Sequence, residues 1–89
     1  MKLKYNFIIN EIAGKKVAVA VGDSVDKFNG FIKMDENTAT VMECLKNDVT
    51  EDEIVAVLVE KFSAQDNEEL RTNLRGLLNE FDKNGILEK

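Results

Sequence analysis

Two arginines and one short strand are the parts of this 89-residue chain whose residue types and spacing point to binding chemistry. Arg71 and Arg75, the only arginines, are one helical turn apart, so a helix places both on one flank, where each guanidinium can grip a carboxylate through two hydrogen bonds. Phe31–Met34 is short and largely apolar, and as an edge strand it would offer backbone hydrogen bonds to an added strand. Plainer roles exist for both: an edge protected by its shortness and Lys33, and arginines paired with nearby acids.

Catalytic side chains are scarce. The chain has no histidine, which removes the commonest general base and metal ligand. Cys44, the single cysteine, has no histidine partner and is expected to be a small core residue. Asp35, Glu36 and Asn37 lack the regular oxygen spacing of an EF-hand loop, and the glycines are too isolated for a phosphate-binding loop. We therefore expect a non-enzyme with no metal and no cofactor.

The acidic clusters have a structural explanation. The runs 51–53 and 68–69 fall in the first turns of predicted helices, where the helix dipole favours negative charge. Net charge is −5 overall, with +3 over residues 1–34 and −8 over residues 35–89. Because the helical half is the acidic half, binding to nucleic acid is disfavoured.

Three strands are predicted in the first part of the chain. Residues 7–13 and 16–21 are rich in β-branched residues, and Gly14 marks a hairpin between them. Alternation places Val17, Val19 and Val21 on one face of the second strand. Asn29-Gly30 is a turn signal before the third strand, Phe31–Met34, and the short connections favour antiparallel pairing.

Three helices are predicted after the strands. Asp35 or Asn37 caps the first, Thr50 begins a capping box with Glu53, and Asp66 caps the third. Asn84-Gly85 ends the third helix, and Ile86-Leu87 is expected to fold back as an apolar contact or short strand. The apolar stripe of the third helix consists of Leu70, Leu74, Leu77, Leu78 and Phe81. The pattern predicts one α+β domain over residues 1–89, with a three-stranded antiparallel sheet followed by three helices.

No membrane segment or signal peptide is expected. The longest uninterrupted apolar run, residues 17–21, is far below the roughly 20 residues that a membrane span needs. No apolar h-region follows the positively charged N-terminus. A cytoplasmic, reducing location is the expectation, and one free cysteine is compatible with it.

Three stretches resemble the PqqD family: residues 34–45, which lead into the first helix; the Thr-x-x-Glu-Ile-Val run that begins at Thr50; and the Gly-Ile-Leu ending at residues 85–87. The resemblance covers about residues 6–88. Met34, Asp35 and Asn37 stand where the family pattern has Leu, Asn and Thr. The two polar replacements still supply capping oxygens, so the expected fold is unaffected.

The resemblance implies a winged-helix-like recognition element for ribosomally synthesised and modified peptides. Family members bind the leader segment of a precursor peptide and deliver it to a maturase, often a radical-SAM enzyme. The leader lies as an extra strand against the third strand, in a cleft walled by the third helix. On this chain the implied peptide-binding residues are Phe31, Ile32, Lys33 and Met34 from the strand and Asn67, Leu70, Arg71, Leu74, Arg75 and Leu78 from the helix. Lys33, Arg71 and Arg75 would favour a leader with acidic and apolar residues.

Two alternatives stay open. The edge strand could pair with its own copy to give a homodimer, or the protein could be an adaptor for another partner. A winged-helix DNA-binding protein is less favoured, because its recognition helix would be acidic.

Overall fold

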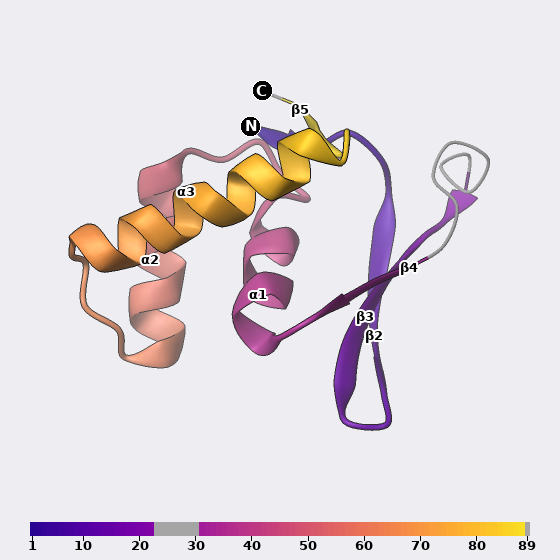
Figure 1. Cartoon of the computed structure of the whole chain (residues 1–89), viewed down its shortest axis with the longest axis horizontal. Helices are drawn as coiled ribbons and strands as arrows, with labels where there is room; N and C mark the ends of the chain where they lie inside the picture. Colours follow the sequence, from indigo (N-terminus) through magenta and orange to yellow (C-terminus); the bar gives the residue numbers. More distant parts are fainter. Residues whose placement is uncertain (23–30, 89) are drawn as a thin grey trace.

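The computed structural model describes residues 1–22 and 31–88 of the chain, and Figure 1 shows the arrangement of its elements. In order they are β1 (Lys2–Leu3), β2 (Phe7–Ile12), β3 (Lys15–Ala20), β4 (Phe31–Met34), α1 (Glu36–Cys44), α2 (Glu51–Phe62), α3 (Glu68–Lys83) and β5 (Leu87–Glu88). β2, β3 and β4 form an antiparallel sheet in that order, and the three helices follow it, which confirms the predicted α+β fold. The turn predicted at Asn29-Gly30 lies outside the described residues. None of the described helices combines the length and the apolar character that crossing a membrane requires.

The β2–β3 hairpin closes through a two-residue turn. Ala13 and Gly14 both have positive φ angles, 52° and 79°, as the turn that suits the twist of paired strands requires. Ala13 is a costly residue for that conformation, whereas glycine adopts it freely. The turn sets the register in which Ile12 lies opposite Lys15 and Phe7 opposite Ala20. The predicted hairpin is confirmed, and its register decides which side chains face the helices.

The strand register confirms that Val17 and Val19 share one face of the sheet, and it is the opposite face that packs against the helices. Ala18 and Ala20 are 0% and 5% exposed and belong to the main core. The valines of β3 lie on the other face: Val17 is buried there and Val19 is half-buried, and neither belongs to the core cluster around Ala18. We call this side the outer face, and by strand register it carries Ile8, Asn10, Ile12, Lys15, Val17, Val19, Phe31 and Lys33. Small alanines on the inner face allow the helices to pack close to the strands.

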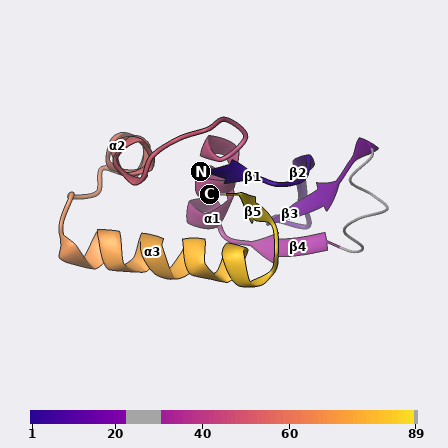
Figure 2. The ribbon, with the colours of Figure 1, turned by 90° about the horizontal axis from the view of Figure 1, so that it is seen from above.

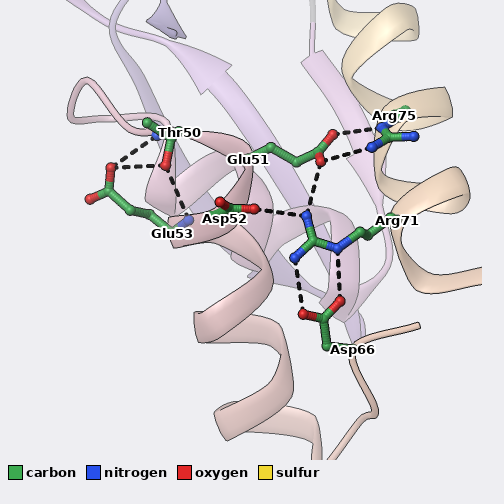
Figure 3. Close-up of polar contacts among 7 residues, drawn as sticks. All are labelled: Thr50, Glu51, Asp52, Glu53, Asp66, Arg71 and Arg75. Carbon is green, nitrogen blue, oxygen red and sulfur yellow. Dashed lines mark hydrogen bonds and ion pairs between the residues drawn. The ribbon is translucent and has the colours of Figure 1, made fainter. Parts of the chain in front are cut away.

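Each helix begins at a polar cap. The Asp35 side chain accepts a hydrogen bond from the Thr38 amide at 2.8 Å. Thr50 and Glu53 form the predicted capping box, visible in Figure 3. The cap of α3 is Asn67 and not Asp66, because the Asn67 side chain accepts from the Leu70 amide at 2.9 Å. Placing the cap at Asp66 was therefore wrong by one residue, and the Asp66 carboxylate binds an arginine instead.

The ends of the described chain meet in a second, two-stranded sheet, and Figures 1 and 2 show them side by side. Gly85, with φ 73°, reverses the chain after α3 as predicted, and β5 then pairs antiparallel with β1. The sequence suggested a strand at Ile86-Leu87, but it did not predict β1. The largest fully buried side chains come from α1 and the residue after it, from α2, and from the residue before β5. They are Val41, Met42, Leu45, Ile54 and Ile86. The core therefore joins the helices to the last residues of the chain.

Candidate functional site

β4 presents one edge that no described strand covers. It pairs with β3 on one side, and within residues 1–22 and 31–88 no strand pairs with the other side, which we call the β4 edge. Ile32 and Met34 are half-buried and pack against the core. Phe31 and Lys33 lie on the outer face, where Phe31 is 59% exposed and the Lys33 ammonium lies 5.9 Å from its ring centre. Unpaired backbone groups and alternating side chains are the two features that an added strand uses.

An apolar groove of about 340 Å³ begins just beyond β4. It lies among the start of α1, the second half of α2 and the first two-thirds of α3, and its lining residues are Asp35, Asn37, Thr38, Val41, Leu58, Phe62, Ala64, Leu70, Asn73, Leu74 and Leu77. Asp35, which lines the groove, directly follows the last residue of β4, so one end of the groove lies next to the end of that strand. Figure 2 shows α3 and β4 in the same layer of the molecule, below α1 in that view.

One face of α3 supplies the helical wall of this groove. Leu70, Leu74 and Leu77 recur at helical spacing and line it, with Asn73 between them. Leu78, 7% exposed, belongs to the core and does not line the groove. Asn67 uses its side-chain oxygen to cap the helix. The groove wall is therefore a stripe of leucines with one amide.

Arg71 and Arg75 lie on the flank of α3 that faces the start of α2, as Figure 3 shows. Arg71 binds Asp66 through Nε and Nη2 at 2.8 and 2.9 Å. Its Nη1 donates to Asp52 at 2.7 Å and to Glu51 at 3.2 Å. Arg75 holds Glu51 through Nε and Nη2 at 2.8 and 3.1 Å. All three nitrogens of the Arg71 guanidinium are therefore engaged by carboxylates of this chain.

The electrostatics of this network follow from its hydrogen bonds. Hydrogen bonding from Arg75 lowers the pKa of Glu51, and hydrogen bonding from Arg71 lowers the pKa of Asp66. The same contacts, with Asp66 first for Arg71 and Glu51 for Arg75, raise the pKa of each arginine. All these groups are charged at neutral pH, so the network acts as an ionic clamp between α2 and α3.

The structure does not bring the predicted basic residues together. Lys33 is on the outer face of the sheet, whereas Arg71 and Arg75 are on the α2 side of α3, and neither arginine lines the groove. Of the predicted helical residues, Leu70 and Leu74 do line it.

Sequence reasoning missed several groove residues. Helical spacing from Leu70 reaches both Asn73 and Leu77, and Leu77 was already part of the apolar stripe, so these two could have been found. Phe62 and Ala64 gave no signal, since they join the groove only because the end of α2 packs beside α3.

The structure offers little that could bind a metal. No three His, Cys, Asp or Glu side chains of the described ranges are grouped to hold an ion. Cys44 is half-buried and packs against the core, and burial raises the pKa of its thiol. The features that remain for binding are the β4 edge and the apolar groove.

Comparison with known families identifies the chain. Residues 16–87 match the family described as "Coenzyme PQQ synthesis protein D (PqqD)". The match includes β3 from its second residue onward, β4, the helices α1, α2 and α3, and the return of the chain after α3. No curated protein and no solved structure is a significant match. Because the family match covers well over half of its length, this chain belongs to the PqqD family.

Proposed function

We propose that this protein binds the leader segment of a ribosomally made precursor peptide by strand addition and presents it to a maturase, such as a radical-SAM enzyme. The observation that carries the proposal is the β4 edge, whose last residue is followed by Asp35 at one end of an apolar groove beside α3. Membership of the PqqD family supports it, since this family supplies non-catalytic, peptide-binding partners of an enzyme in PQQ synthesis.

In such a site, affinity and selectivity come from different groups. Backbone N–H and C=O groups of β4 pair with a peptide of any sequence, so they give affinity with little selectivity. Selectivity comes from the groove, where Leu70, Leu74 and Leu77 would cover an apolar side chain of the leader. Asn73 and Asn37 add hydrogen-bonding groups at the same groove. The site needs no cofactor for this work.

An amide-shift titration tests the proposal. The probes are synthetic leader segments from short open reading frames encoded next to this protein, added to isotopically labelled protein. We expect shifts concentrated at residues 31–35 and 67–78, because the first range contains the β4 edge and the second contains the residues of α3 that line the groove. A well-dispersed spectrum that no peptide changes would contradict the proposal while leaving the fold intact.

A matched pair of substitutions tests the groove. Ala64→Phe places a ring where Ala64 lines the groove, whereas Ala56→Phe adds the same ring to an exposed position on α2 outside it. We expect Ala64→Phe to weaken binding of a responsive peptide about tenfold or more, which is roughly the loss of one buried apolar contact. Ala56→Phe should bind as the parent protein does. Equal binding by both variants would remove the groove from the site.

Self-association is the second candidate, and the exposed Phe31 beside an unpaired edge favours it. Two β4 edges could pair and bury both rings, in competition with a peptide. Size-exclusion elution that shifts with protein concentration, and loses that dependence when a peptide is added, would show that both use the same edge.

A further inference from the structure

The strand β4 shows two chemically different rows of side chains along its edge. Ile32 and Met34 face the core, while Phe31 and Lys33 face the outer side. The strand register supports this assignment, because Ile32 lies opposite the core residue Ala18 and Phe31 lies opposite Val19. A strand added to the β4 edge continues the same pleat, so its side chains alternate between the two faces. One row of the added peptide therefore never meets α3.

At the positions that the structure describes, the outer face carries positive charge and no negative charge. Its described positions include Lys15 and Lys33 and no carboxylate, and Lys33 forms no ion pair in the part of the chain that the structure describes. Carboxylates lie near the end of β4, since Glu11, Asp35 and Glu36 line the same shallow hollow as Lys33. They are otherwise engaged or turned inward: Glu36 pairs with Lys16 and Lys61, Asp35 caps α1, and Glu11 lies on the inner face.

The arginines differ from Lys33 in this respect. Arg71 already binds three carboxylates, and Arg75 holds one in a two-bond contact. A peptide carboxylate would have to displace part of this clamp to reach them. Lys33 requires no such exchange, because its ammonium lies over the ring of Phe31 and forms no ion pair among the described residues. A peptide carboxylate can therefore pair with Lys33 without breaking an existing ion pair, whereas pairing with either arginine would break one.

We propose that the protein recognises side chains on both faces of the added peptide strand. The acidic residues of that strand are recognised on the outer face by Lys33, and not by Arg71 and Arg75. The inference rests on the proposed strand addition. The substrate that it implies alternates in character: apolar side chains point inward against Ile32 and Met34, while the outward row carries a carboxylate opposite Lys33. An apolar outward residue fits beside Phe31.

Two synthetic peptides with blocked ends test this inference. In one, Leu and Glu alternate over eight residues; in the other, Leu and Lys alternate. Either peptide can slide by two residues without changing its faces, so the unknown register does not matter. With the leucines inward, the charged row lies beside Lys33. Affinities come from amide shifts of β4 residues during titration.

We expect the parent protein to bind the Leu-Glu peptide about two- to fivefold more tightly than the Leu-Lys peptide, the range typical of one cross-strand charge pair. Lys33→Glu should reverse the preference. Lys15→Glu is the matched control, since it makes the same charge change on the same face but on β3, and it should keep the preference. Arg75→Gln should also keep it.

The outcomes separate the two proposals. Shifts at β4 without any charge preference, an unchanged preference in Lys33→Glu, or a preference lost in Arg75→Gln would overturn the outer-face inference and leave strand addition standing. If neither peptide shifts the β4 amides of the parent protein, strand addition of such peptides fails, and the inference fails with it.

Discussion

Arg71, a residue whose type suits the binding of a carboxylate, already contacts three carboxylates of its own chain. Its guanidinium contacts Asp66, which precedes α3, and Glu51 and Asp52 at the start of α2. Its side chain is 27% exposed, less than the 56% of Arg75. Exposed ion pairs contribute little individually, but a network of several charges in good geometry contributes more.

The first prediction concerns this clamp. Arg71→Gln should lower the thermal midpoint at pH 7 by a few degrees, and by more than Arg75→Gln, because Arg71 joins three carboxylates and Arg75 joins one. Lys15→Gln, at an exposed position of the hairpin, is the control for loss of one positive charge. Thermal melts followed by circular dichroism provide the measurement. Midpoints equal to that of the parent protein in both arginine variants would show that the clamp does not stabilise the fold.

The same network predicts the pH dependence of stability. Glu51 and Asp66 have lowered pKa values in the folded protein, chiefly through hydrogen bonds from Arg75 and Arg71 respectively. Their contribution is complete above the ordinary carboxyl pKa and is lost as pH falls through the lowered values, so the midpoint should fall between about pH 5 and pH 3. In Arg71→Gln this part of the fall should be smaller.

At the scale of elements, the sheet is more asymmetric than its sequence suggests. The valines of β3, the bulkier β-formers, face outward, and the alanines face the helices. Ala18 is fully buried, and Val19, next to it in the chain, is half-buried on the opposite face. Two neighbouring positions therefore have opposite tolerance for added volume.

This asymmetry gives a prediction about packing. Ala18→Leu should reduce the free energy of unfolding by about 1–3 kcal/mol, because extra methylenes do not fit a close-packed interior. Val19→Leu should change it by less than about 0.5 kcal/mol, since that side chain can extend into solvent. Urea unfolding of both variants measures the difference. If Ala18→Leu is as stable as Val19→Leu, the assignment of the two faces is wrong.

At the scale of the whole molecule, the return of the chain after α3 holds the fold together. The amide of Leu3 donates to the Leu45 carbonyl, and the amide of Lys4 donates to the Ile86 carbonyl, both at 2.8 Å. Ile86 is fully buried in the same core as residues of α1 and α2. Ile86 therefore connects the N-terminal segment of the chain with the core formed by the helices.

Removing the Ile86 side chain should destabilise the whole protein. Ile86→Ala is expected to cost about 2–5 kcal/mol, the usual range for a large buried aliphatic residue, out of the roughly 5–15 kcal/mol that stabilises a small domain. Ile12→Ala, at a position that is 59% exposed, should cost less than about 1 kcal/mol. Urea unfolding measures both. A small loss for Ile86→Ala would show that the end of the chain unfolds independently of the helices.

The local features of the fold could be predicted from the sequence. The hairpin around Gly14, the capping box at Thr50 and the stop at Gly85 each depend on a few neighbouring residues, so their sequence signals were sufficient. The strand order and the three helices followed from changes of periodicity. The cap of α3 was misplaced by one residue because Asp66 and Asn67 are equally suitable by type, and only the contact with Arg71 distinguishes them.

The sequence by itself thus determined the elements, their order and the family likeness, because these are set by short-range patterns of side chains. Only the tertiary structure decided how the candidate site is assembled. Arg71 and Lys33 have the same sign in the sequence, but packing places one in a clamp between α2 and α3 and the other on the outer face of the sheet. The groove likewise exists only where α1, α2 and α3 meet. Contacts between residues far apart in the chain carry no local signal, and these contacts decide which charges remain available to a partner.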